Sequence, residues 1–165
     1  MKKDIALLHS ALISAISKTM EHMAFMEIEV EKKQLNPLIW EENILWALLP
    51  LQKPFTGALS LEVSEEFGKF ITEEVYGEGE DKQFSDHAVQ DVLAEVLNTI
   101  GGRFLNKLAP LAEEIKIGVP RTGKGQIPEM AAKVASVIVN VDGNYFTTTI
   151  AGKDFKNLSK EDLKL

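Results

Sequence analysis

The sequence contains no cysteine among its 165 residues, which excludes disulfides, thiolate nucleophiles and cysteine-ligated metal sites. Basic residues are outnumbered, since 18 Lys and Arg stand against 25 Asp and Glu and leave a net charge of −7. Such a chain lacks the positive field that binding to phosphate backbones requires, so we expect no nucleic acid partner. The three histidines, His9, His22 and His87, show no metal-ligand spacing, and we expect no metal site.

Long apolar runs are also absent. The amino terminus begins with two lysines and an apolar stretch, but Asp4, His9 and Lys18 interrupt it well short of the ~20 apolar residues of a membrane span. We therefore expect no membrane insertion and a cytoplasmic protein. A chain of this length can bury a sizeable core without disulfides or a structural metal ion. We expect a single domain over residues 1–165, with a flexible tail from about residue 156.

The hydrophobic pattern predicts a mixed arrangement of helices and strands. Apolar residues recur at helical spacing in the first segment, and the later apolar segments alternate as strands do. Helices are predicted over about 4–25, 65–76 (capped by Ser64 and ended by Gly77) and 85–108, and strands over 43–51, 55–63, 114–119, 135–141 and 145–150. This order indicates an α+β (mixed α/β) fold, an antiparallel-rich sheet with the long N-terminal helix and the long central helix packed on it.

The central helix, capped by Ser85, has two distinct faces. Its apolar residues form one broad inward face: Val89, Leu93, Val96, Leu97, Ile100, Phe104 and Leu108. At about 100° per residue, Asp91, Glu95, Asn98 and Gly102 share a narrow arc of the opposite face. A carboxylate and a carboxamide are therefore expected to project together into solvent.

Two adjacent glycines, Gly101 and Gly102, lie inside this helix. Each costs about 1 kcal/mol relative to alanine, so their presence requires a reason such as close approach of another backbone. We interpret the pair as room for a docked partner.

The segment from Gly118 to Gly125 nearly matches the phosphate loop G-x4-G-K-[ST]. Its last position is Gly125 in place of the hydroxyl residue that binds Mg²⁺, and Pro128 falls where the following helix should continue. We interpret this segment as a flexible loop and not as a nucleotide site.

The central helix resembles the signature of the CheC, CheX and FliY chemotaxis phosphatases, Asp or Ser, x3, Glu, x2, Asn, about x21 or x22, Pro. Here it reads Asp91-x3-Glu95-x2-Asn98-x21-Pro120. The resemblance extends to the helix text DVLAEVLNTIGGRF and to the hairpins before and after it, and so covers most of the chain.

The resemblance implies a phosphatase acting on the phospho-aspartate of a CheY-like response regulator in two-component signalling. Asn98 would orient the attacking water, and Glu95 would pair with the receiver's active-site lysine. Asp91, Gly102 and Pro120 are expected at the docking surface. The chain would have no cofactor of its own, because the phosphorylated receiver supplies the Mg²⁺, and a homodimer is implied.

The first helix contains a degenerate copy of the signature, Ser17-x3-Glu21-x2-Ala24, in which the carboxamide is missing. This favours the CheX type, with one such helix, over the CheC type, with two. A non-catalytic module that keeps the fold and only binds a response regulator is the alternative function.

Overall fold

The computed structural model of the chain describes residues 2–32, 42–77 and 84–159. Its helices are α1 (Lys2–Ala24), α2 (Glu65–Tyr76), α3 (Asp86–Leu108) and α4 (Lys153–Lys156). Its strands are β1 (Glu29–Val30), β2 (Ile44–Lys53), β3 (Gly57–Ser64), β4 (Lys116–Ile117), β5 (Arg121–Lys124), β6 (Lys133–Val141) and β7 (Asn144–Ala151). The predicted α+β architecture is confirmed.

The strands form one antiparallel sheet in the order β1-β6-β7-β3-β2-β4, and β5 also pairs with β2. The β2–β3 hairpin lies near its centre, with Leu49 opposite Leu59. Alternate residues of both strands are fully buried against the helices, because successive side chains of a strand point to opposite faces. The sheet therefore provides a continuous apolar floor for the helices.

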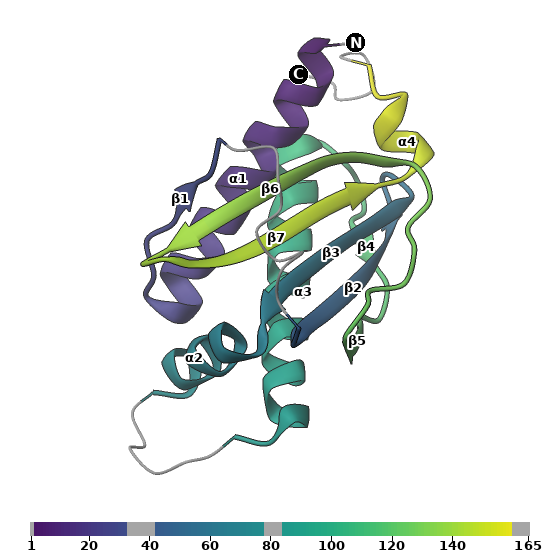
Figure 1. Cartoon of the computed structure of the whole chain (residues 1–165). Coiled ribbons are helices and arrows are strands. Elements are labelled where there is room, and N and C mark those ends of the chain that lie inside the picture. Colours follow the sequence, from purple (N-terminus) through teal and green to yellow (C-terminus); the bar gives the residue numbers. More distant parts are fainter. Residues whose placement is uncertain (1, 33–41, 78–83, 160–165) are drawn as a thin grey trace.

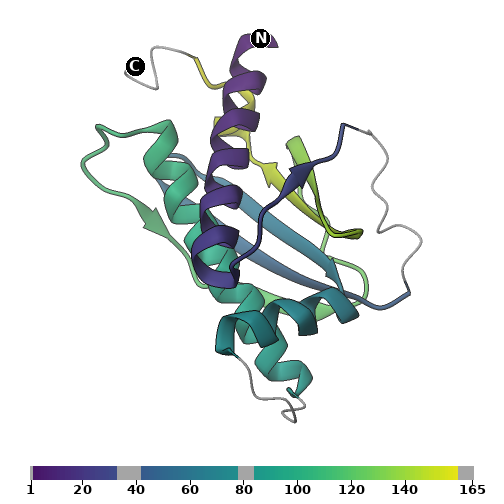
Figure 2. The ribbon, with the colours of Figure 1, turned by 90° about the vertical axis from the view of Figure 1, so that its left-hand side faces the viewer.

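Helices α1 and α3 lie side by side on one face of this sheet and run in opposite directions, as Figures 1 and 2 show. The predicted inward face of α3 is confirmed, since all seven of its apolar residues are buried. Between the two helices, the Arg103 Nη2 donates a hydrogen bond to His22 Nδ1 at 3.1 Å. The exposed side of α3 consequently lies on the molecular surface beside α1.

The starts of α2 and α3 are fixed as the sequence predicts. Ser64 Oγ accepts a hydrogen bond from the Phe67 N–H, and Ser85 Oγ accepts one from the Ala88 N–H, both at 3.1 Å. These caps satisfy backbone donors that a helix start leaves unpaired.

Lys124, at the end of β5, connects the starts of both helices. Its Nζ lies 3.2 Å from Glu65 Oε2 and 4.0 Å from Asp86 Oδ2. The hydrogen bond from Lys124 holds the pKa of the Glu65 carboxyl below its usual range. The first turns of α2 and α3 are thereby held to the edge of the sheet.

The segment between α3 and β6 differs from the prediction. The expected strand over 114–119 is reduced to β4, and the expected flexible loop contains β5, which pairs with the outer edge of β2. Gly123 of β5 lies against the ring of Trp46, where an added Cβ would collide. Packing on Trp46 therefore requires a glycine at position 123 of the apparent phosphate loop.

Two of the predicted segments fall partly outside the described residues. Residues 78–83, within the connection expected between α2 and α3, and residues 160–165, within the expected tail, are not among them. In the described part of that tail, Leu158 is buried against the core.

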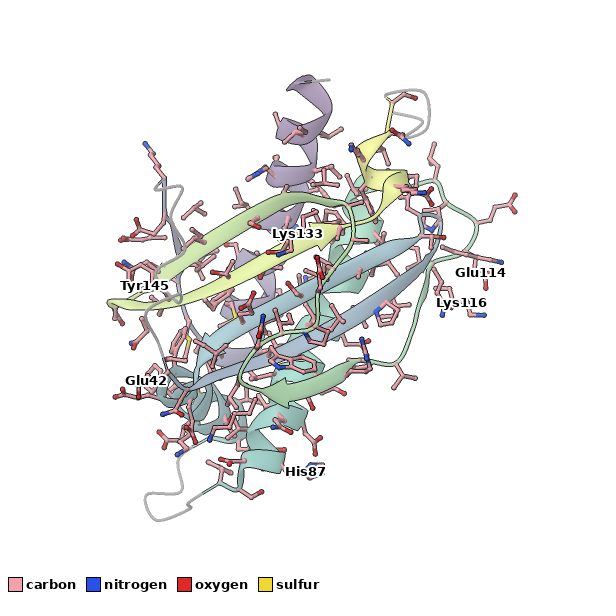
Figure 3. The ribbon with its side chains drawn as sticks, turned by 45° about the vertical axis from the view of Figure 1, so that its right-hand side comes forward. Glu42, His87, Glu114, Lys116, Lys133 and Tyr145 are labelled. Atoms are coloured by element: carbon pink, nitrogen blue, oxygen red, sulfur yellow. The ribbon has the colours of Figure 1, made fainter. Side chains whose placement is uncertain are left out.

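Figure 3 shows the face of the sheet that points away from α1 and α3, with Lys133 on it.

Candidate functional site

The exposed side of α3 carries four residues of the predicted signature, Asp91, Glu95, Asn98 and Gly102, which we call the α3 ridge. Asp91 and Glu95 are exposed, and Asn98 and Gly102 are half-buried. The structure thus places the predicted carboxylate and carboxamide on the surface of one helix, one turn apart.

The functional groups of Glu95 and Asn98 are free to meet a partner. Neither side chain has a hydrogen-bond or ion-pair partner within residues 2–32, 42–77 and 84–159. The hydroxyl of the neighbouring Thr99 donates to the Glu95 carbonyl oxygen at 3.0 Å, so it is satisfied by the helix itself. The pair therefore presents an acceptor-only carboxylate beside a group that both donates and accepts.

Asp91 differs from Glu95 because it has a local partner. The Asp91 Oδ2 lies 3.5 Å from His87 Nε2 one turn earlier, and both side chains are well exposed. Figure 3 shows His87 projecting outward near the start of α3. An exposed pair of this kind contributes little to stability, and it leaves Asp91 at the rim of the ridge.

Gly101 and Gly102 of α3 have different surroundings. The prediction that both glycines make room for a partner is therefore wrong for Gly101. A Cβ added to Gly101 would lie 2.5 Å from Leu49 Cδ2, so this glycine allows α3 to lie close to β2. A Cβ added to Gly102 would meet nothing within 4 Å. Only Gly102 leaves space open on the ridge.

Pro120 is not part of α3; it lies immediately before β5 and is half-buried. The following strand is connected to α3 by Thr122, whose hydroxyl contacts Gln90 Oε1 at 3.5 Å. Pro120 therefore stands at the start of a strand that adjoins the motif helix.

The degenerate signature on α1 is not arranged as a second site. Glu21 is exposed and Ser17 is half-buried, but Ala24, at the carboxamide position, is fully buried in the core. Met20 and Met26 are also buried within the chain itself. Of the two copies of the signature, the one on α3 therefore pairs a carboxylate with a carboxamide on the surface, and the one on α1 does not.

Within the described part of the chain, no three His, Asp or Glu side chains are grouped closely enough to hold a metal ion. None of the helices found there is both long enough and apolar enough to cross a membrane.

Solved structures with the same fold include chemotaxis proteins. The crystal structure of the chemotaxis protein CheX from Vibrio vulnificus is 15% identical, with a TM-score of 0.68 over 87% of this chain and 95% of that one. FliY from Thermotoga maritima is 13% identical, with a TM-score of 0.68 over 99% and 97% of the two chains. A CheX–CheY–BeF₃–Mg²⁺ complex from Borrelia burgdorferi is 20% identical, with a TM-score of 0.60 over 86% and 95%. This chain thus shares its fold, a sheet backed by paired helices, with these structures.

The sequence also matches the family described as chemotaxis phosphatase CheX, over residues 46–142. The chain therefore belongs to the CheX family, as its signature predicted. The matched segment includes most of β2 and all of β3, α3 and β6. No curated protein matches the sequence.

Proposed function

We propose that this chain dephosphorylates the phospho-aspartate of a CheY-like response regulator, with Asn98 and Glu95 of the α3 ridge as the acting residues. The observation that carries the proposal is the pairing of an exposed carboxylate and an unpartnered carboxamide on the motif helix of a CheX-family chain. The CheX of the Borrelia complex is bound to CheY with BeF₃ and Mg²⁺, which supports a receiver as the partner. This function implies a cytoplasmic location.

In the proposed reaction, water attacks phosphorus and the bond from phosphorus to the aspartyl oxygen breaks. The products are the free aspartate carboxylate and inorganic phosphate, which takes up the proton lost by water. The Asn98 carboxamide accepts a hydrogen bond from the water through Oδ1 and donates one to a phosphoryl oxygen through Nδ2. The catalytic advantage lies in position and fixed dipoles, because phosphoryl transfer requires little covalent chemistry from the protein.

Glu95 would pair with the lysine of the receiver's active site and so set the register of docking. One helical turn separates it from Asn98, so a partner held at Glu95 is held at a fixed distance from the carboxamide. We further propose that Asp91 and Pro120 contact the receiver at the rim, and that Gly102 lets the receiver's backbone approach the helix.

Mg²⁺ belongs to the phosphorylated receiver in this proposal and is part of the substrate. Mg²⁺ is held in proteins by carboxylates and phosphate oxygens, and the receiver's phospho-aspartate site offers both. The CheX–CheY–BeF₃–Mg²⁺ complex from Borrelia burgdorferi agrees with this assignment.

We also propose that the chain is a homodimer. Strand β1 is an outer strand of the sheet, and its Val30 is an exposed apolar side chain. Exposed sheet edges are usually covered or paired in native proteins. Met20 of α1 and the following Met26 are packed within the chain and offer no apolar surface for a dimer contact.

The central test compares Asn98→Ala with Glu95→Ala. Neither side chain belongs to the core, so each variant should change the free energy of unfolding by less than about 1 kcal/mol. Asn98→Ala should bind the receiver normally but turn over about a hundredfold more slowly, because it loses an interaction made mainly in the transition state. Glu95→Ala should weaken docking by about 2 kcal/mol, because the receiver's lysine loses its partner.

Decay of the phosphorylated receiver and binding to its beryllofluoride form are measured for each variant. Thr99→Ala is the matched control for Asn98, because its hydroxyl is already bonded to the helix backbone. Glu73→Ala, an exposed carboxylate of α2, is the control for Glu95. Near wild-type decay with Asn98→Ala would remove the α3 ridge from the mechanism. If the wild-type chain affects no more than one equivalent of phosphorylated receiver, it is a binding module and not a catalyst.

A further inference from the structure

A groove with a volume of about 320 Å³ opens between α1 and α3 on the surface of the molecule. Figure 2 shows the two helices side by side, diverging toward the start of α1 and the end of α3. We call this groove the α1–α3 groove. It is lined by Ser14, Ala15 and Lys18 of α1 and by Arg103, Asn106 and Lys107 of α3.

The lining of this groove is strongly basic. Among the described residues it contains three cations, Lys18, Arg103 and Lys107, and no carboxylate. This concentration runs against the composition of the chain, whose net charge is −7. A concave surface lined by charges of one sign focuses its field on whatever enters it.

The three cations are available to a ligand. Lys18 and Lys107 are exposed and have no ion-pair partner in the part of the chain that the structure describes. Arg103, in the same described part, donates one hydrogen bond, to His22 Nδ1. A guanidinium has five N–H donors, so this bond orients Arg103 and leaves most of its donors unused.

The groove adjoins the α3 ridge through Asn106, which lies one turn beyond Gly102 on the same side of α3. Along the helix axis Arg103 and Asn106 lie about 8 Å and about 12 Å beyond Asn98, and Arg103 is turned from the ridge toward α1, where it contacts His22. A globular partner that covers Glu95 and Asn98 is wide enough to reach these positions, because standard interfaces bury roughly 800 Å² on each side.

We propose that the α1–α3 groove binds acidic side chains of the receiver, next to the site of phosphoryl transfer. The inference rests on the proposed function. A receiver that holds Mg²⁺ beside a phospho-aspartate carries carboxylates on that face; those that ligate the metal stay beside Asn98, and the groove takes other acidic side chains at the rim of the contact. Asp91 and Glu95 of the ridge repel such carboxylates, and the groove's cations offset this repulsion and guide the partner into register. The groove, at about 320 Å³, is large enough to admit a carboxylate side chain.

The test is the double variant Lys18→Glu with Lys107→Glu, which keeps the Arg103–His22 bond. Its affinity is measured for a CheY-type receiver carrying beryllofluoride and Mg²⁺, at several salt concentrations. Binding should weaken about tenfold or more, and the affinity should depend less on salt. Turnover at saturating phosphorylated receiver should stay at the wild-type value, because the groove does not touch the reacting atoms.

The matched control is Lys32→Glu with Lys153→Glu, two exposed lysines outside the groove whose reversal changes the net charge by the same amount. Equal loss of affinity in both double variants would overturn the inference, since net charge alone would then explain it. Unchanged affinity in the groove variant, or a fall in saturated turnover alone, would overturn it while the proposed function stands. The wild-type chain is measured first, and its failure to bind or dephosphorylate any receiver would reject the function and the groove together.

Discussion

Alanine substitutions at the two neighbouring glycines of α3 should have opposite effects on stability. In Gly101→Ala the new Cβ would lie 2.5 Å from Leu49 Cδ2 and within 3.8 Å of Leu59, in a part of the core where both leucines are fully buried. Overpacking of this kind costs about 1–3 kcal/mol, which exceeds the gain of about 1 kcal/mol from helix propensity. We therefore expect a net loss of about 1 kcal/mol.

In Gly102→Ala the added methyl group meets nothing within 4 Å. The helix propensity then acts alone and should stabilise the fold by about 1 kcal/mol. The two variants should thus differ by about 2 kcal/mol, which for a domain of this size is a separation of about 4–8 °C in melting temperature. Thermal unfolding of both variants beside the wild type measures this difference directly.

The more stable variant should be the poorer partner. The methyl group of Gly102→Ala stands on the α3 ridge, where we propose that the receiver's backbone approaches, so its affinity for the receiver should fall although its fold is strengthened. Gly101→Ala changes no atom of the exposed ridge and serves as the control for binding. If Gly102→Ala is less stable than wild type, or Gly101→Ala more stable, the assignment of the two helix faces is refuted.

The other predictions concern pH, metal and assembly. Burial raises the pKa of the Glu62 carboxyl, and nearby Lys133 lowers it in part. A carboxyl whose pKa is raised by folding stabilises the folded state while it is protonated. This contribution is fully present below the unfolded pKa of about 4.3 and is lost as pH rises through the folded pKa. Glu62→Gln should therefore raise the melting temperature more at pH 7 than near pH 4, and the reverse order would contradict this. Dephosphorylation should stop when Mg²⁺ is withheld from the receiver and survive prior chelation of this chain; a metal ligated by the chain and required for activity would refute the assignment. Sedimentation at micromolar concentration should show twice the chain mass of 18.3 kDa, whereas a single species of 18.3 kDa would reject the homodimer.

Much of the fold follows from local patterns in the sequence. The starts of α2 and α3 were predictable because Ser64 and Ser85 are strong caps followed by apolar residues at helical spacing. The two faces of α3 followed from the same spacing, and so did the position of Glu95 and Asn98 on the side of α3 away from the core. These features depend on contacts within a few residues, which a sequence displays directly.

Other features depend on contacts between distant segments. Strand β5 was missed because its glycines suggest a loop, and only the pairing with β2 and the packing of Gly123 on Trp46 make it a strand. The difference between Gly101 and Gly102 is visible in the spacing of the sequence. Gly101 is spaced four residues from both Leu97 and Leu105, which are buried, so the helical period already placed it toward the core.

The α1–α3 groove could not be predicted from either helix alone. Lys107 lies four residues after Arg103, a spacing that indicates only a basic stripe on a surface helix. The stripe becomes one wall of a groove because α1 runs antiparallel beside it and contributes Lys18. Its charge is therefore a property of the tertiary structure.

The two long helices have unequal roles because of a single buried position. On α1 the place of the carboxamide is occupied by Ala24, which is fully enclosed in the core. An asparagine there would have to bury a group with four hydrogen-bonding sites among apolar neighbours, which costs about 1–3 kcal/mol when partners are missing. Packing thus prevents α1 from carrying a second water-positioning group, whereas Asn98 on α3 is half-exposed. The exposed side of α1 instead supplies Lys18 to the groove, so the groove draws on both helices, whereas the proposed catalytic pair comes from α3 alone.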